Sequence, residues 1–268
     1  MKINGHAFTF GADPEVFVGT DGKPASAIGI VGGSKYKPKP VKGGAVQEDN
    51  VLAEFNIRPS SNESTFVRSI QGVLTVLDAM LPGGMAIIPQ LCSHEYTIEE
   101  LRSFGPDAFI FGCDPDFNAY TGEQNIPPEA SSTLRTAGGH IHVGYDDPNE
   151  GSAQQIVRAM DLFLGVPSVL IDKDTRRRGM YGGAGCLRYK PYGVEYRTLS
   201  NFWIFSEERI RWAFRQTVAA IDAATRGAAR DPATTFTIPT ADIIHCINTS
   251  DRQMAQRIVQ QLDIPLVQ

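Results

Sequence analysis

Four short segments of the sequence alternate apolar side chains with chemically reactive ones, and this pattern constrains the fold more than any other feature. In an extended strand, successive side chains point to opposite faces. Each segment would therefore bury one face and present acids, imidazoles or a guanidinium on the other. We expect these strands over His6–Gly19, Val46–Arg58, Gly138–Tyr145 and Tyr189–Ser200.

The reactive faces of these strands carry side chains that suit metal binding. If the strands are neighbours, their carboxylates and histidines meet on one concave surface. So many like charges require cations nearby, and oxygen-rich ligation favours Mg²⁺ or Mn²⁺ over zinc. An ordinary surface strand is the alternative, above all for the first acid of the set. By strand parity, the reactive faces present Asp13, Glu15, Glu54, His140, His142, Glu195 and Arg197.

Glycine surrounds two of the features that indicate ligand binding. His140 and His142 share one face, and glycines on both sides of the pair suggest that backbone is pressed against a ligand. Further along, Arg176-Arg177-Arg178 precedes the glycine-rich stretch Gly179–Gly185, and Arg188 with Lys190 follows. Glycine amides can approach a phosphate and arginines can clamp it, so this segment predicts a phosphate site, with a basic surface turn as the alternative.

The remaining sequence predicts a single α+β domain over residues 1–268. We find no internal repeat and no linker long enough to separate two domains. The 26 glycines and 17 prolines predict many turns and more sheet than helix. Apolar residues at helical spacing or amphipathic patterns predict helices near Ser64–Leu81, Ala153–Leu164, Glu207–Arg226 and Asp251–Leu262.

Charge and composition narrow the partners. The net charge of −5 argues against nucleic acid as a partner, and no apolar stretch is long enough to predict a membrane span. The opening residues do not read as a secretory signal and the four cysteines form no CxxC pair, so we expect a cytoplasmic protein. The Gly29–Gly44 stretch holds four lysines and is expected to be a mobile, solvated loop, with cover for an anionic substrate as the alternative.

Read together, the motifs resemble the phage-type carboxylate–amine ligases, a branch of the glutamine synthetase and glutamate–cysteine ligase superfamily. The resemblance implies a curved antiparallel sheet with a concave active-site face backed by helices. It also implies that ATP phosphorylates a carboxylate to an acyl phosphate, which an amine converts to an amide with release of phosphate. The motifs run in order as Gly11-Ala-Asp-Pro-Glu15, Glu48-Asp-Asn-Val-Leu-Ala-Glu54-Phe-Asn56, Gly138-Gly-His-Ile-His142-Val-Gly144 and Tyr192-Gly-Val-Glu195-Tyr-Arg197.

The resemblance, with the glycine-rich segment, also implies roles for single residues. Glu48 or Asp49 is a further candidate ligand, and Asp13 is shorter than the glutamate that glutamine synthetases carry there. The implied Mg²⁺ or Mn²⁺ ligands are Asp13, Glu15, Glu54, His140 and Glu195. The implied ATP contacts are His142, Arg178, Tyr181, Gly185, Arg188 and Arg197, of which the three arginines would also stabilise the transferring phosphoryl group.

Several alternatives stay open at this point. The His140 and His142 pair could instead hold zinc in a metal-dependent hydrolase, or the chain could bind nucleotide without turnover. Asp114, Asp116 and Asn118 could line a substrate pocket or simply make a turn, and Cys113 and Cys186 are expected to be buried small residues. Small-molecule or peptide carboxylates and amines are the expected substrates. If the gene is phage-borne, the cytoplasm in which the protein is expected is that of the host. The oligomeric state is open.

Overall fold

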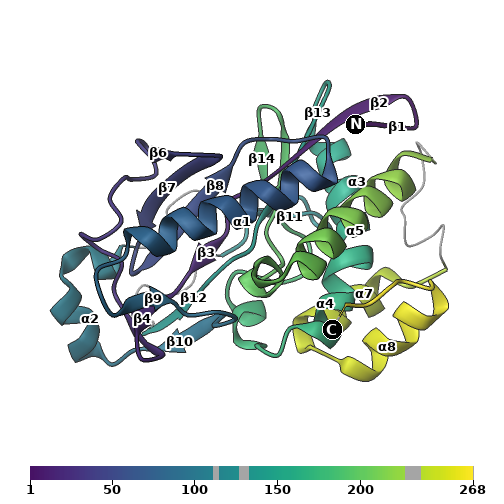
Figure 1. The fold of residues 1–268 in the computed structure, drawn as a ribbon. Helices are drawn as coiled ribbons and strands as arrows, with labels where there is room; N and C mark the ends of the chain where they lie inside the picture. The colour runs from purple at the N-terminus through teal and green to yellow at the C-terminus, as the bar shows by residue number, and fades with distance from the viewer. Residues whose placement is uncertain (111–114, 127–132, 227–236, 268) are drawn as a thin grey trace.

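The computed structural model describes residues 1–110, 115–126, 133–226 and 237–267, and they form an α+β fold with several antiparallel sheets (Figure 1). The predicted fold class is therefore confirmed. Helix makes up about 40% and strand about 26%, so the expectation of more sheet than helix is wrong. The reason is that many glycines lie in turns at positive φ, where they connect elements and say little about the elements themselves.

Two antiparallel sheets carry the site, and two smaller ones extend them. The six-stranded sheet runs in the order β1 (Lys2–Ile3), β2 (His6–Ala12), β13 (Ile141–Tyr145), β15 (Gly193–Tyr196), β14 (Cys186–Lys190), β11 (Phe117–Asn118). The four-stranded sheet runs β3 (Glu15–Val16), β8 (Leu52–Ile57), β7 (Gly44–Asp49), β6 (Lys39–Val41). The smaller sheets are β5 (Lys23–Ala25), β4 (Val18–Thr20), β9 (Met85–Ile87), and β10 (Ser93–Glu95) with β12 (Leu134–Thr136).

The chain crosses from the six-stranded sheet to the four-stranded sheet at Asp13-Pro14. Strand β2 ends one residue before Asp13, and β3 begins one residue after Pro14. Proline has no N–H to donate to a ladder, which favours a break at this point. The amide of Glu15 still donates to the carbonyl of Gly138 at 2.9 Å, so the two sheets remain joined. The curved sheet that we expected thus takes the form of two connected sheets.

Two of the predicted strands are hairpins. The Val46–Arg58 segment turns at Asn50, which has φ 55°, a left-handed conformation that asparagine tolerates well. The Tyr189–Ser200 segment turns between β14 and β15, before Gly193. Gln47 to Asn50 are four consecutive polar residues, and Pro191 and Gly193 flank Tyr192, so both turns carry sequence signals that the single-strand predictions passed over.

The predicted helices are confirmed, with shifted ends. The short helix α2 starts at a Thr97–Glu100 capping box, as that sequence pattern predicts, whereas α4 and α7 were not predicted. The helices are α1 (Glu63–Met80), α2 (Ile98–Phe104), α3 (Glu150–Met160), α4 (Val166–Ile171), α5 (Glu207–Arg226), α7 (Thr240–Thr249) and α8 (Arg252–Gln261). A π-helical turn, η2 (Asp161–Gly165), joins α3 to α4, and 3₁₀ turns lie at η1 (Pro106–Phe109), η3 (Arg176–Gly179) and η4 (Asn201–Phe205).

The helices pack against one face of the sheets and leave the other face for the site. Helix α1 lies across β7 and β8, and α5 lies between α1 and α3 (Figure 1). In this layer Phe66 and Ile70 of α1 join the same buried core as Phe55 of β8. The combined helix Glu150–Ile171 is long and apolar enough to span a membrane by composition, but 67% of that stretch is buried inside the protein, as in a core helix.

Candidate active site

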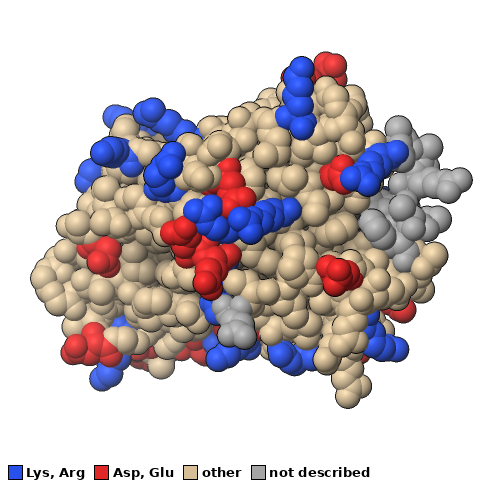
Figure 2. All heavy atoms as spheres, turned by 45° about the vertical axis from the view of Figure 1, so that its right-hand side comes forward, with Lys and Arg blue, Asp and Glu red and all other residues tan. Residues whose placement is uncertain are grey.

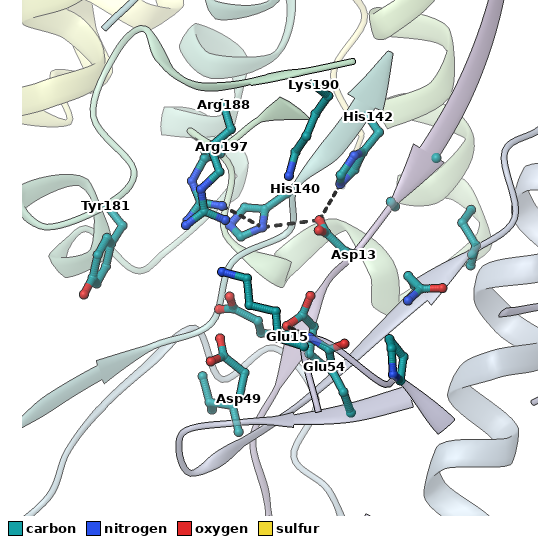
Figure 3. A pocket seen from close by; sticks show the side chains of 18 of the residues that line it. Asp13, Glu15, Asp49, Glu54, His140, His142, Tyr181, Arg188, Lys190 and Arg197 are labelled. Carbon is teal, nitrogen blue, oxygen red and sulfur yellow. Dashed lines mark hydrogen bonds and ion pairs between the residues drawn. The ribbon is translucent and has the colours of Figure 1, made fainter. Parts of the chain in front are cut away.

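A cavity of about 640 Å³ lies against the reactive faces of both main sheets. Acidic and basic side chains meet in the middle of the face shown in Figure 2. Figure 3 shows the arrangement inside: Glu15, Asp49 and Glu54 lie on one side, and Arg188 and Arg197 lie opposite them. Charges of both signs therefore line one half-open cavity.

Strand register places three reactive residues in one row across the six-stranded sheet. His142 of β13 lies directly opposite Glu195 of β15, and Glu195 lies opposite Arg188 of β14. On its other side His142 faces Gly11, which leaves room beside the imidazole. Neighbouring strands lie about 4.8 Å apart, so the row brings these side chains into direct range of one another.

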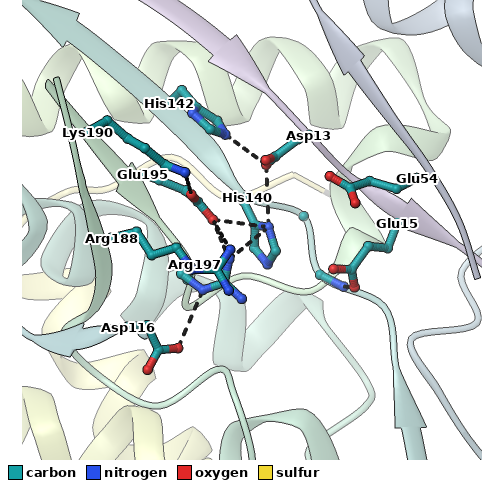
Figure 4. Close-up of polar contacts among 12 residues, drawn as sticks. Asp13, Glu15, Glu54, Asp116, His140, His142, Arg188, Lys190, Glu195 and Arg197 are labelled. Atoms are coloured by element: carbon teal, nitrogen blue, oxygen red, sulfur yellow. Dashed lines mark hydrogen bonds and ion pairs between the residues drawn. The ribbon is translucent and has the colours of Figure 1, made fainter. Parts of the chain in front are cut away.

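Asp13, His140 and Glu195 form a group with the composition of a metal site. The Nδ1 atom of His140 lies 3.4 Å from Asp13 Oδ1 and 3.6 Å from Glu195 Oε1 (Figure 4). One ligand atom from each residue lies within 4.8 Å of the others. Burial and the charge of Arg197 lower the pKa of His140 to about 3, so its imidazole is neutral, as metal ligation requires.

Glu195 is fully buried and stays charged because cations surround it. Lys190 Nζ lies 2.8 Å from Glu195 Oε2, and Arg188 Nη1 lies 3.4 Å from Oε1. Arg197 Nη1 also donates to Oε1. Burial favours the neutral acid, but these cations, Arg197 first, hold the pKa of Glu195 well below its usual range. The carboxylate is therefore available as a ligand at neutral pH.

A second acidic group lies on the four-stranded sheet, and its negative charges are less fully offset by neighbouring cations. Glu15 of β3 and Glu54 of β8 lie opposite each other, and Asp49 lines the same cavity. Gln47 donates to Glu54 at 2.7 Å, and the amide of Gly138 donates to Glu15 at 2.6 Å.

The pKa values of this second group report mutual repulsion. Burial and then the charge of Asp49 raise the pKa of Glu15 to about 7. Burial, followed by the charges of Asp13, Asp49 and Glu15, raises the pKa of Glu54 well above its usual value. A divalent cation near these oxygens would reduce the repulsion. Among the described residues, Asp13, His140 and Glu195 are the group whose three ligand atoms lie within 4.8 Å of one another, and these residues fit a metal ion.

The structure separates the predicted nucleotide contacts into two sets. His142, Tyr181, Arg188 and Arg197 line the cavity. Arg178 does not: it is buried elsewhere, donates to Ser168 Oγ and Ser250 Oγ at 3.1 Å each, and lies 3.9 Å from Asp172.

Gly185 also lies outside the cavity lining. Its amide, expected to approach a phosphate, donates instead to the buried carboxylate of Asp161 at 2.6 Å. The glycine-rich segment is therefore fixed to η2 at this point, and the placement of both Arg178 and Gly185 is a correction to the sequence analysis.

Arg177 is the cavity residue that sequence reasoning missed. Its Nη2 atom lies 3.1 Å from His140 Nε2, and its Nη1 donates to the carbonyls of Arg197 and Thr198 at 2.8 and 3.1 Å. Consecutive residues of a 3₁₀ turn point about 120° apart, so Arg177 and Arg178 cannot both face the cavity. The run of three arginines indicated a site, but which arginine faces the cavity depends on the backbone of η3.

The remaining candidates sort by their contacts. Glu48 accepts from the amides of Gly29 and Gly32 at 3.0 and 2.7 Å and holds a loop, whereas Asp49 lines the cavity. Asp116 lies 3.5 Å from Arg197 Nε. Asn118 accepts from the amide of Tyr120 at 2.8 Å, as in a turn.

The thiols are consistent with a structural role where they are described. Cys186 is buried, and burial raises its pKa to about 12, which fits a buried small residue. Cys113 and Asp114 lie outside the described residues.

Fold and site together define an α+β protein with a cavity that combines ligands for a hard cation with guanidinium groups for an anionic substrate. The family described as Phage phiEco32-like COOH.NH2 ligase-type 2 matches residues 131–241. That range includes His140, the arginine–glycine segment and Arg197, and the match supports the phage-type carboxylate–amine ligase family and an enzyme that joins a carboxylate to an amine. No curated protein matches the chain.

Proposed function

We propose that the chain is an ATP- and Mg²⁺-dependent ligase that joins a carboxylate to an amine through an acyl phosphate and releases ADP and phosphate. Small molecules or peptides supply the carboxylate and the amine. The observation that carries the proposal is that Glu15, Glu54 and Asp49 lie in one cavity opposite Arg188 and Arg197, with the Asp13 and His140 side chains beside these arginines. Such a cavity suits a reaction in which one anion must approach another.

The acidic side chains would hold the cations. Asp13, His140 and Glu195 would hold one divalent ion, and a second would lie among Glu15, Glu54 and Asp49. Bound Mg²⁺ or Mn²⁺ would neutralise the phosphates of ATP and let a carboxylate substrate approach them. The raised pKa values of Glu15 and Glu54 support this assignment, because those carboxylates gain most from an added positive charge.

The guanidinium groups would orient the γ-phosphate and stabilise its developing charge. Arg197 is held rigidly between Glu195 and Asp116, and the charges of these acids raise its pKa against the opposing effect of burial. Arg177 and Arg188 flank it in the cavity lining. Preorganised cations of this kind stabilise a transition state without reorganisation during the reaction.

The proposed chemistry balances in two steps. An oxygen of the substrate carboxylate attacks the γ-phosphorus, the bond to the β-phosphate oxygen breaks, and ADP leaves. The amine nitrogen then attacks the acyl carbon, loses a proton and expels phosphate, which leaves an amide. Both steps need exclusion of water from the acyl phosphate, so bound substrates would have to cover the open side of the cavity.

Binding of a fluorescent ATP analogue, titrated with and without Mg²⁺, tests the proposal. We expect Glu54→Ala and Glu195→Ala to abolish the metal-dependent part of binding, whereas the exposed control Glu99→Ala keeps it. Release of ADP and phosphate should depend on the amino acids and amines offered. Unchanged binding in both folded site variants would overturn the proposal, and tightly held zinc without ATP affinity would favour a hydrolase.

A further inference from the structure

A cluster of exposed lysines borders the cavity on the side of the four-stranded sheet. We call Lys35, Lys37, Lys39 and Lys42 the basic rim; all four are exposed, and Lys35 also lines the cavity. The Gly29–Gly44 stretch that carries them contains no acidic residue. Lys and Arg side chains gather at the upper left of Figure 2, on the side of the molecule where β6 and β7 lie in Figure 1.

The loop that carries the rim is tied down at several points, which differs from the mobile loop expected from the sequence. Glu48 accepts from the amides of Gly29 and Gly32, and Val31 is fully buried beneath the loop. Ser34 and Lys37 exchange backbone hydrogen bonds of 3.1 and 3.0 Å. Strand β6 pairs with β7 from Lys39 to Val41. The lysines are therefore presented from a fixed backbone.

Protection of a sheet edge accounts for part of the rim but not for all of it. Lysine and proline on an edge strand discourage unwanted pairing, and Lys39 with Pro40 fits that role on β6. Lys35 precedes the strand and reaches the cavity. Tyr36, between two rim lysines, is 93% exposed, and tyrosine is enriched where proteins contact a partner. The rim thus has features of a binding surface.

We propose that the basic rim binds an acidic peptide whose reacting carboxylate enters the adjacent cavity. The proposal rests on the ligase function proposed above and names the substrate class for it. Lys39 and Lys42 are three residues apart. Because a strand advances about 3.3 Å per residue, β6 covers about 7 Å from Lys39 to Val41, and Lys42 lies beyond it in the turn to β7. Four lysines spread over this length suit a ligand with several carboxylates.

The charge distribution favours an acidic peptide over a nucleic acid. The neighbouring cavity wall carries Asp49, Glu54 and Glu15, which repel an anion unless cations are bound. A peptide rich in Glu or Asp offers carboxylates to the lysines and one more to the reaction. A phosphodiester chain offers charges to the rim but no carboxylate to phosphorylate.

Fluorescence anisotropy with a labelled hexaglutamate peptide, with Mg²⁺ present and nucleotide absent, tests the proposal. We expect the double variant K37E/K39E to weaken peptide binding at least tenfold, because both lysines lie on the rim and outside the cavity lining. The charge-matched control K2E/R257E, at exposed positions outside the rim, should bind within twofold of the wild type. Added salt should weaken wild-type binding, and Tyr36→Ala should weaken it separately.

Three outcomes would overturn this assignment. The first is equal peptide affinity in K37E/K39E and the control. The second is self-association of K37E/K39E with peptide binding intact, which would mean that the lysines serve to prevent pairing at the edge of the sheet. The third is tighter binding of a single-stranded oligonucleotide of equal charge through the same lysines. Because K37E/K39E should retain Mg²⁺-dependent ATP binding, failure at the rim remains distinguishable from failure of the ligase function.

Discussion

Glu15 and Glu54 lie directly opposite each other in neighbouring antiparallel strands. Like charges in such a pair destabilise a sheet, and both side chains are largely withdrawn from water. Without a cation, the pair therefore favours a bound proton over two charges. The site is built at the expense of the stability of the sheet that carries it.

The pH dependence of stability should report this pair. The pKa of Glu15 is about 7 in the fold, against 4.5 ordinarily, so its contribution to stability is present below pH 4.5 and lost as pH rises to about 7. Glu15→Gln removes the ionisable group, so the variant does not lose this stability as the pH rises. We expect the metal-free variant to exceed the wild type by about 1–3 kcal/mol above pH 7 and to match it near pH 4. Chemical denaturation in chelator across this range measures the difference.

The variant must be compared with the wild type because His140 acts in the opposite direction. Its pKa falls to about 3 from 6.5, so the stability it contributes is lost as pH falls through that window. Subtraction at each pH cancels this effect. Millimolar Mg²⁺ should stabilise the wild type more than Glu15→Gln. A difference between the two proteins that does not change with pH would contradict the assignment.

Substitution of Arg188 should affect ATP binding, whereas substitution of Arg178 should affect the stability of the fold. Arg188 lines the cavity, so Arg188→Ala should weaken Mg²⁺-dependent ATP binding at least tenfold with a small change in stability. Arg178→Ala leaves the buried carboxylate of Asp172 without its arginine and should cost about 3 kcal/mol, with ATP affinity of the folded protein unchanged. Anisotropy and denaturant unfolding of both variants measure the two effects. Equal loss of ATP affinity in Arg188→Ala and Arg178→Ala would indicate that Arg178 also belongs to the site.

Asp161 should be a large contributor to stability. Its buried carboxylate accepts from Tyr120 Oη at 3.0 Å, Tyr196 Oη at 2.8 Å and the Gly185 amide at 2.6 Å. Asp161→Ala leaves these donors unpaired and should cost about 3 kcal/mol or more. Asp222→Ala, at a half-exposed helix position, should cost less than about 1 kcal/mol. Similar losses in urea titrations of the two variants would contradict the role of Asp161.

Gly139 should tolerate no side chain. A Cβ there would lie 2.3 Å from the carbonyl oxygen of Ser200 and 2.5 Å from Trp203 Nε1, so Gly139→Ala should destabilise the protein by about 2–3 kcal/mol. Gly72 provides the control: it is exposed within α1 with nothing within 4 Å of a Cβ. Gly72→Ala should stabilise by about 0.5–1 kcal/mol. Opposite signs in thermal unfolding are the expected result.

Sequence reasoning worked where side chains lie on regular strands. Parity placed His142, Glu195 and Arg197 on reactive strand faces, and the pairing of β13 with β15 brings His142 opposite Glu195. A strand has two faces, and the apolar residues identify the buried one, so the polar face follows directly. The amphipathic helices could be predicted for the same reason, since one face must meet the core.

Sequence reasoning failed where the backbone is irregular. In the 3₁₀ turn η3, the choice between Arg177 and Arg178 depends on a rotation of about 120°, which no periodic pattern encodes. The hairpin turn at Asn50 was missed although four consecutive polar residues, Gln47 to Asn50, precede Val51. Gly185 looked free to meet a phosphate, but its amide pairs with Asp161, a residue distant in sequence. These placements depend on contacts between segments, which a single sequence does not show.

The Asp13-Pro14 crossing links the evolution of the two acidic groups. Asp13 closes the end of one sheet and Glu15 opens the other, with a single residue between them. An insertion or deletion at this point would shift one ladder against the other by a residue and reverse the faces of every following side chain in β3. The distance between the two groups is therefore fixed by covalent geometry, and variation among relatives is expected in the rim and loops around the cavity.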